Sequence, residues 1–161
     1  MNIRTLTVNG VLAALYIAVT MLIQPFGFTN IQFRVPEIFN HLIVFNRKYF
    51  IGIVIGVFFS NLFFSSLGVY DLIFGVGQSV LALSITVLVA RFVKNIWARM
   101  IVNTIVFTAT MFMIAIELNI VLGLPFWLTY LTTAVGEFVV MAVGMPIMNA
   151  LNKRIDFKNL V

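Results

Sequence analysis

The hydrophobic pattern of this chain consists of long apolar segments separated by short polar breaks, from Leu6 to Leu151. The apolar runs are continuous and do not alternate with polar residues, which favours membrane-spanning helices over the strands of a β-barrel. We therefore predict an all-α integral membrane protein with six transmembrane helices in a single membrane domain over residues 1–161. The expected helices cover roughly residues 7–25, 36–46, 49–66, 70–92, 97–121 and 126–151.

The second of these segments is unusually short. At about 1.5 Å of rise per residue, residues 36–46 are too short to cross a hydrocarbon core of about 30 Å. Pro36 stands at a favourable position in the first turn of a helix. We expect a helix here that neighbouring segments cover, or around which they thin the bilayer.

Composition agrees with a membrane location, since mean hydropathy is +1.12 and only 9% of residues are charged. The absence of cysteine excludes disulfides, thiolate metal sites and cysteine nucleophiles. A pI near 10.0 would suggest a nucleic-acid partner in a soluble protein, but here basic residues flank apolar segments, where topology and anionic lipid explain them better. The first segment lacks a small-residue cleavage site before Gln24, so we expect a permanent helix rather than a signal peptide.

The basic residues predict the orientation of the helices. With six spans and an inner N-terminus, only Arg34 lies outside, which satisfies the positive-inside rule. The inner side then holds the other nine basic residues, Arg4, Arg47, Lys48, Arg91, Lys94, Arg99, Lys153, Arg154 and Lys158. A five-span arrangement with an outer N-terminus gives the same balance, because Arg34 and Arg4 then exchange sides. Both arrangements agree on the last four helices.

The segment from Gln32 to Glu37 places an amide and two opposite charges between hydrophobic runs. A charge near the bilayer is unfavourable unless it is paired or faces water, so it is usually retained for a function. Arg34 is therefore a candidate ligand-binding residue. The alternative is that Arg34 and Glu37 form an ion pair that stabilises a loop.

Other polar residues are expected in the same outer half of the membrane. Asp71 and Glu117 fall at the outer ends of the fourth and fifth helices, and Glu137 lies about eleven residues into the sixth, where an unpaired carboxylate is unfavourable. These positions predict a polar pocket. Its candidate ligand-binding residues are Gln32, Arg34, Glu37, Asn40, Asp71, Gln78, Glu117, Trp127, Tyr130 and Glu137.

Some residues near this predicted pocket have a second interpretation. Trp127 and Tyr130, next to Phe126, fit an interfacial aromatic belt as well as they fit a pocket. Asn61 is a further polar residue that can converge there. We interpret His41 as a hydrogen-bonded structural residue rather than a metal ligand, because no second His completes a typical site. No metal is expected.

Small residues recur every four positions on two of the predicted helices. The first helix carries Gly10, Ala14 and Ala18, and the third repeats the pattern from Gly52 to Ser60. Such stripes let another helix backbone approach closely. Each suits packing within the bundle, and a first helix at the bundle edge would present its stripe to a partner protein.

Motifs of common enzymes are missing from the sequence. No lysine follows a glycine, so there is no phosphate loop, and no zinc-protease, serine-hydrolase or dinucleotide-binding motif occurs. We expect a solute-binding protein that takes energy from partners, and no enzyme. Two other classes stay open, a channel formed by oligomerisation through the glycine stripes, and a small intramembrane enzyme using Glu137, Asp71 or His41.

Three short stretches resemble the queuosine-precursor transporter (QueT) family, namely Ile31–Glu37, Leu124–Leu128 and Gly136–Val140. Their order and spacing, the six-segment layout and the small-residue first helix extend the resemblance over essentially the whole chain. Proteins of this family are substrate-binding S components of energy-coupling factor (ECF) transporters.

The resemblance implies an S-component bundle with both termini cytoplasmic, in the cell membrane of a prokaryote. It implies an outward-facing pocket formed by the later helices and capped by the loop from Gln24 to Val35. It also implies docking onto a membrane T component through the face that holds Gly10, Ala14 and Ala18. Two cytosolic ATPases would use ATP, so no cofactor is expected in this chain.

The resemblance further implies a 7-deazaguanine queuosine precursor as the ligand, and the candidate residues suit its chemistry. Glu137 or Glu117 can accept both N–H donors of the pyrimidine edge, and Arg34 or an amide can donate to the carbonyl. Trp127 or Tyr130 can stack on the ring. A pyridine or pyrimidine vitamin, pyridoxine or hydroxymethylpyrimidine, is the alternative ligand.

Overall fold

Helices make up almost all of the computed structural model, which describes residues 2–27 and 33–161. No strand occurs in these residues, so the predicted all-α class is confirmed. The long helices are α1 (Ile3–Gly27), α3 (Phe50–Phe64), α4 (Val69–Val89), α5 (Ile96–Thr110), α6 (Phe112–Leu122) and α7 (Phe126–Ile155). The short ones are the 3-10 helices η1 (Val35–His41) and η2 (Arg47–Tyr49) and the α-helices α2 (Leu42–Phe45) and α8 (Phe157–Leu160).

Five segments of the described chain are long and apolar enough to cross a membrane. They are Ile3–Gln24, Arg47–Phe64, Val69–Val89, Ile96–Leu122 and Phe126–Ile155. These correspond to the first and to the third to sixth predicted helices, with ends that differ by a few residues. The count of six spans stays a prediction, because Val35–Phe45 is shorter than the other segments.

The predicted helix at 97–121 is wrong in one respect, since it is interrupted at Met111 into α5 and α6. The Met111 amide donates to the carbonyl of Thr108, three residues back, at 3.3 Å. Just before it, the Thr110 hydroxyl donates to the carbonyls of Val106 and Phe107. Back-bonding by Thr often bends helices, although the same arrangement at Thr133 leaves α7 unbroken.

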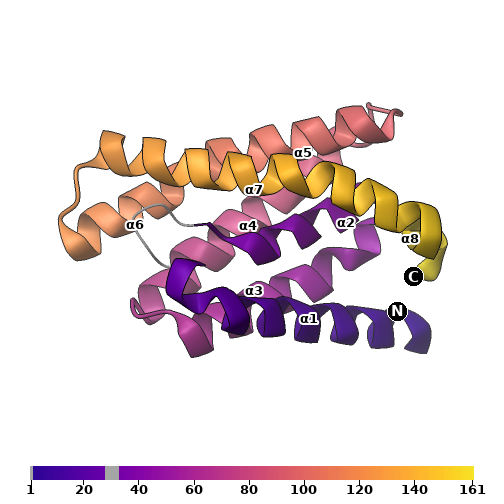
Figure 1. Cartoon of the computed structure of the whole chain (residues 1–161), viewed down its shortest axis with the longest axis horizontal. Coiled ribbons are helices and arrows are strands. Elements are labelled where there is room, and N and C mark those ends of the chain that lie inside the picture. Colours follow the sequence, from indigo (N-terminus) through magenta and orange to yellow (C-terminus); the bar gives the residue numbers. More distant parts are fainter. Residues whose placement is uncertain (1, 28–32) are drawn as a thin grey trace.

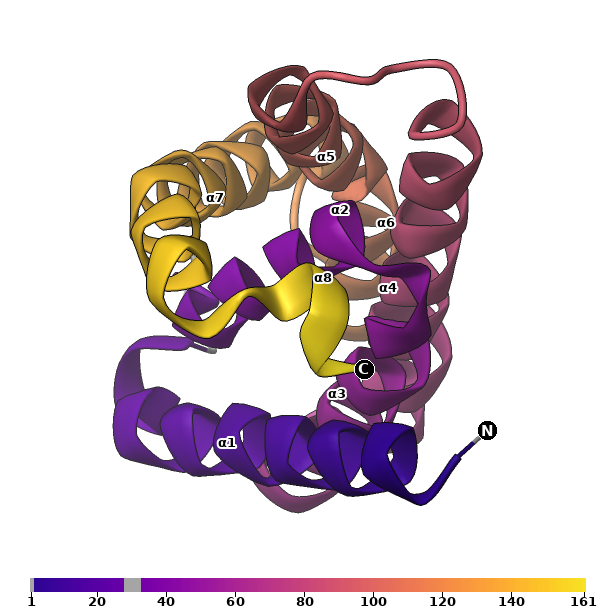
Figure 2. The same ribbon diagram turned by 90° about the vertical axis from the view of Figure 1, so that its right-hand side faces the viewer.

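The second predicted segment forms η1 followed by α2, and neighbouring helices cover it as expected. With about 2.0 Å of rise per residue in a 3-10 helix and 1.5 Å in an α-helix, the two together extend about 20 Å. Most of their side chains are buried, and η1 packs against α7, α1 and α5. Figure 2 shows α2 inside the ring formed by the longer helices. This segment therefore carries its polar residues into the protein interior.

The small-residue stripe of α3 is used for packing inside the bundle against α1. A Cβ at Gly56 would lie 2.7 Å from the Cβ of Tyr16, so only glycine permits this approach. At Gly52 a Cβ would overlap Asn9, whose Oδ1 accepts a hydrogen bond from the Gly52 amide at 2.9 Å. Tyr16 belongs to the main apolar core, together with Ile53 and Val57.

Both chain termini lie at the same end of the bundle, at the right of Figure 1. The connection between α4 and α5, and the junction of α2 with α3, lie at this end as well. The nine basic residues other than Arg34 belong to these termini and connections. The asymmetry of charge along the sequence is thus an asymmetry between the two ends of the molecule.

Candidate functional site

Arg34 stands directly before η1 and is buried, with only 8% of its surface exposed. Its Nη1 lies 3.5 Å from Oε1 of Glu37, and its Nη2 lies 3.9 Å from Oδ1 of Asp71. The predicted ion pair with Glu37 is therefore present, but it extends to a second carboxylate on α4. Burial by itself disfavours the charged guanidinium, yet Glu37 and Asp71 outweigh this effect and raise the pKa of Arg34 above its ordinary value.

The 3-10 geometry of η1 explains how Arg34, Glu37 and Asn40 come to lie in one row. A 3-10 helix has three residues per turn, so side chains three positions apart are eclipsed. The Asn40 Nδ2 donates to Oε2 of Glu37, and Glu37 pairs with Arg34. All three side chains are buried. A cation, a carboxylate and an amide therefore follow one another along this row in the protein interior.

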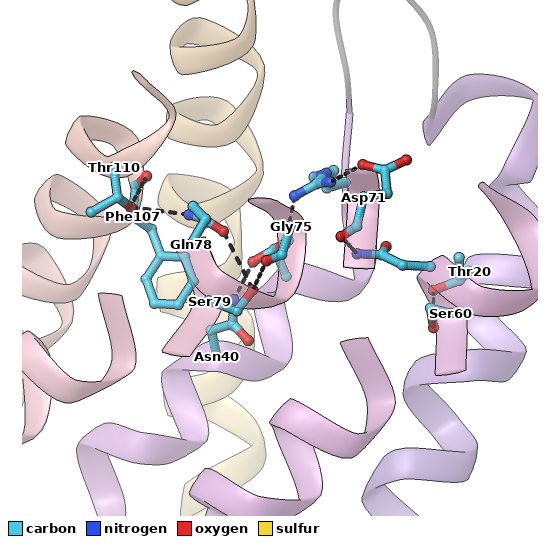
Figure 3. Close-up of polar contacts among 12 residues, drawn as sticks. Thr20, Asn40, Ser60, Asp71, Gly75, Gln78, Ser79, Phe107 and Thr110 are labelled. Carbon is cyan, nitrogen blue, oxygen red and sulfur yellow. Dashed lines mark hydrogen bonds and ion pairs between the residues drawn. The ribbon is translucent and has the colours of Figure 1, made fainter. Parts of the chain in front are cut away.

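Asp71 is held in place by the connection between α3 and α4. Its Oδ2 accepts a hydrogen bond from the Ser65 hydroxyl, and its carbonyl accepts one from the Asn61 Nδ2 at 3.0 Å. One turn later, Gly75 leaves room for the neighbouring side chains, since a Cβ there would lie 2.5 Å from Asn61 Nδ2 and 3.5 Å from Arg34 Nη2. Figure 3 shows Asp71 and Gly75 on this stretch of α4.

Glu117 on α6 and Glu137 on α7 are fully buried. Neither carboxylate has a hydrogen-bond partner for either oxygen among residues 2–27 and 33–161. Glu137 lies near enough to Glu37 and Arg34 to interact with their charges, and Glu117 likewise with Asp71 and Arg34. Unpaired buried carboxylates are strongly unfavourable, so these oxygens are available to donors from a ligand.

A row of hydrogen bonds continues from this cluster towards α5, as Figure 3 shows. The Gln78 Nε2 donates to the Thr110 hydroxyl at 3.0 Å, and its Oε1 accepts from the Ser79 hydroxyl at 3.3 Å. The Oδ1 of Asn40 is buried without a partner in the part of the chain described. Both polar atoms of the Gln78 side chain are thus hydrogen-bonded within the protein, whereas the Asn40 Oδ1 is an acceptor without a partner among the described residues.

A small cavity of about 30 Å³ adjoins the Arg34 row between α1, η1 and α3. Its lining includes Tyr16, Thr20, Arg34, Glu37 and Ser60. This volume suits about two water molecules, so a flat bicyclic ligand enters only if the surrounding side chains move. The Thr20 hydroxyl donates to Ser60 at 3.1 Å, which links α1 to α3 at the cavity wall.

The aromatic candidates at the start of α7 are not brought into the buried cluster. Trp127 is 78% exposed, and its ring packs edge-on against Phe126. Tyr130 stacks on Phe126, and its hydroxyl donates to the Ala109 carbonyl at 3.2 Å. The exposed indole matches the aromatic-belt interpretation of Trp127. Gln32, the remaining candidate, lies outside the residues that the structure describes.

His41 is hydrogen-bonded inside the protein, as predicted for a structural residue. Its Nε2 lies 2.9 Å from the carbonyl of Met141, so this nitrogen must donate. The Nδ1 then accepts from Asn103 Nδ2 at 3.3 Å. No group of residues that could hold a metal ion occurs in the described residues.

The site also contains residues that were not among the sequence-based candidates, including Tyr16, Thr20, Ser65 and Gly75. Tyr16 and Thr20 interrupt the apolar first helix one turn apart, a signal that could have identified the face towards Arg34. The roles of Ser65 and Gly75 depend on the approach of α3 to α4, which no local pattern reports.

The stripe of Gly10, Ala14 and Ala18 lies on the exposed face of α1. A Cβ at Gly10 would meet no atom within 4 Å. The opposite face, with Asn9 and Tyr16, packs against α3. The stripe is therefore exposed on the described part of the structure.

Comparison with known proteins agrees with the predicted family. The family model described as QueT transporter matches residues 6–153. A protein of Lactococcus lactis subsp. cremoris (strain MG1363), named Queuosine precursor transporter QueT, is 38% identical over 156 residues, which cover 91% of each chain. No solved structure matches. With its several membrane-crossing helices, the chain is a multi-pass membrane protein, and it belongs to the QueT transporter family.

Proposed function

We propose that the chain is the substrate-binding S component of an ECF importer and that it binds a 7-deazaguanine precursor of queuosine. The observation that carries the proposal is the pair of buried carboxylates, Glu117 and Glu137, whose oxygens lack protein partners among the described residues. Family membership supports the transport class, and the related Lactococcus protein bears the name of a queuosine precursor transporter.

The cluster is complementary to the hydrogen-bonding edge of a deazaguanine. The pyrimidine edge presents an amine and a ring N–H side by side, and one carboxylate can accept both. Glu137 is the better candidate, because it is fully buried and lies near enough to both Arg34 and Glu37 to interact with their charges. Arg34, held between Glu37 and Asp71, can then donate to the ligand carbonyl. Charge-assisted hydrogen bonds in a buried site also discriminate against bases that lack these donors.

Binding requires a rearrangement on the side where the 30 Å³ cavity lies. The predicted loop from Gln24 to Val35 includes the connection from the end of α1 at Gly27 to the start of η1 at Val35, and we propose that this connection covers the ligand. Gln32 in this loop would add an amide. Tyr16 already borders Arg34 and Glu37 and can stack on the ring, whereas Trp127 would first have to turn inwards.

The proposed topology has both termini in the cytoplasm of a prokaryote, with Arg34 towards the outside. Support comes from the shared end of both termini and the nine basic residues at that end. We propose that the exposed stripe of Gly10, Ala14 and Ala18 docks onto a membrane T component. Two cytosolic ATPases bound to that component would use ATP, which agrees with the missing phosphate loop.

Binding of 7-deazaguanine to the purified full-length protein in detergent tests this proposal, using calorimetry and mass spectrometry of co-purified small molecules. Glu137→Gln and Glu117→Gln should each be measured, and at least one should weaken binding by tenfold or more, roughly one charge-assisted hydrogen bond. Asp156→Asn, an exposed acidic residue at the turn before α8, is the matched control.

The outcome that overturns the proposed ligand is unchanged affinity in both glutamate variants. Competition with pyridoxine and hydroxymethylpyrimidine tests the alternative ligand class. If one of these vitamins is the ligand, it should displace bound 7-deazaguanine or bind in its place. Uptake into liposomes by this chain alone, without ATPases, would instead support a facilitator.

A further inference from the structure

A basic pocket lies at the end of the bundle that holds both chain termini. It is a cavity of about 360 Å³ between the end of α2, the start of η2, the end of α4, the start of α5, and α8. Its lining includes Arg47, Arg91, Arg99 and Lys158 and no acidic residue. Both ion pairs in residues 2–27 and 33–161 belong to Arg34, so none of the four cations has a carboxylate partner there.

The walls of this pocket are fixed by hydrogen bonds. The Arg99 Nε donates to the Val93 carbonyl at 2.5 Å and Nη1 to the Val44 carbonyl at 3.4 Å, which joins this α5 side chain to the α4–α5 connection and to α2. The Asn46 Nδ2 donates to the Lys158 carbonyl at 2.9 Å. This bond ties α8 to the segment after α2. The fold therefore fixes the guanidinium of Arg99 and brings the backbone of Lys158 to the same pocket.

An apolar groove adjoins the basic pocket on the side of α3 and α4. This second cavity, of about 350 Å³, is lined by Arg47, Phe50, Ser84, Val87 and Leu88. It shares Arg47 and Val87 with the basic pocket. Both α3 and α4 are membrane-crossing segments, so a molecule held at Arg47 can place an apolar chain along them.

We propose that the basic pocket binds the headgroup of an anionic phospholipid, with an acyl chain in the adjoining groove. Arginine forks bind phosphate oxygens through two parallel hydrogen bonds. Four like charges around one cavity repel one another unless an anion lies between them. A free phosphate would satisfy the charges, but it would leave the groove without an occupant, and the shared Arg47 favours a molecule with both parts. The site is separate from Arg34 and does not depend on the proposed substrate.

The test titrates the full-length protein in detergent with phosphatidylglycerol, with phosphatidylcholine of the same acyl chains, and with inorganic phosphate. Native mass spectrometry and thermal unfolding report binding. We expect phosphatidylglycerol to bind at least tenfold tighter than phosphatidylcholine and to raise the melting temperature more than phosphate does. Arg47→Gln/Arg91→Gln should reduce this preference roughly tenfold, since each basic residue contributes to attraction of anionic lipid.

Arg4→Gln/Lys153→Gln is the matched control, because it removes the same charge at the same end but outside the pocket. The proposal is overturned if this control loses the preference equally, or if both lipids bind alike. Phosphate binding as tightly as phosphatidylglycerol would make the site one for a free anion and would also overturn it. If the double variant does not fold, Arg91→Gln alone, just beyond the end of α4, gives the same comparison.

Discussion

The Arg34 guanidinium and the Asp71 carboxylate form a buried ion pair at 3.9 Å between the start of η1 and the first turn of α4. This ion pair thus joins η1 and α4, two segments that are far apart in the sequence. Glu37 shares the same guanidinium at 3.5 Å. A single cation therefore serves two carboxylates, and the buried Glu117 and Glu137 add two further carboxyl groups nearby. The cluster thus holds one guanidinium and four acidic side chains, whose oxygens suit a ligand rich in N–H donors.

Arg34→Ala should lower both thermal stability and ligand affinity. Removing one partner of a buried ion pair typically costs about 3–5 kcal/mol, because the other charge stays buried and unpaired. The double variant Arg34→Ala/Asp71→Asn also removes the Asp71 carboxylate that Arg34→Ala leaves unpaired. It should therefore be more stable than Arg34→Ala, while its affinity for 7-deazaguanine stays low. Melting in detergent and calorimetry measure the two effects. If affinity returns together with stability, Arg34 acts only as a loop-stabilising residue.

Gly75→Ala should disturb the position of Arg34 without changing any charge. The new methyl group would lie 2.5 Å from Asn61 Nδ2 and 3.5 Å from Arg34 Nη2, so these side chains must shift. Overpacking of this kind costs about 1–3 kcal/mol. Gly77→Ala on the same helix is the control, since its nearest contact is the Met113 methyl at 3.4 Å. Equal affinities of the two variants for 7-deazaguanine would argue against a role for Arg34 in binding.

Trp127→Ala should leave affinity for 7-deazaguanine within about twofold of the original value, because the indole is 78% exposed at the start of α7. Tyr16→Leu should weaken binding severalfold, since an aromatic contact contributes about 0.5–1.5 kcal/mol beyond its buried area. Fluorescence of the remaining tryptophan, Trp97, provides a folding control for the first variant. A large loss of affinity in Trp127→Ala would mean that the start of α7 turns inwards around the ligand.

Gly56→Ala should destabilise the protein, because its methyl group would lie 2.7 Å from the Tyr16 Cβ and would separate α1 from α3. The expected loss is about 1–3 kcal/mol, the range for overpacked interiors. Gly10→Ala on the exposed face of α1 has nothing within 4 Å of the added carbon and should melt at the original temperature or above it. Equal melting temperatures would show that α1 and α3 separate easily.

Ala14→Leu/Ala18→Leu should prevent co-purification with the proposed T component while leaving affinity for 7-deazaguanine unchanged. Both positions are exposed on α1, and larger side chains there keep another helix backbone from approaching closely. The matched control is Leu22→Ile, which changes an exposed residue of the same helix without adding volume. An intact complex with the double variant would rule out this stripe as the docking face.

The positions of the helices were predictable from the sequence, because a run of apolar residues long enough to cross a bilayer is a local property. The all-α class, most segment bounds and the gathering of basic residues at one end follow from that pattern and from the spacing of charges. The acidic residues were also identified as candidates, since a carboxylate within an apolar run is unusual whatever it contacts. The break at Met111 was not predicted, because it falls within one continuous apolar segment, Ile96–Leu122.

Only the tertiary structure decided which of these residues lie together. The 3-10 conformation of η1 aligns Arg34, Glu37 and Asn40, whereas an α-helix would rotate each successive residue of the row by about 60° around the axis. That conformation is stabilised by the helices packed around it, so residues 35–41 alone do not specify it. The pairing of Arg34 with Asp71 depends likewise on Gly75 letting α4 approach, and the exposure of Trp127 depends on how α7 packs. Contacts between distant segments thus set the geometry of the candidate site, while local hydrophobicity sets its helices.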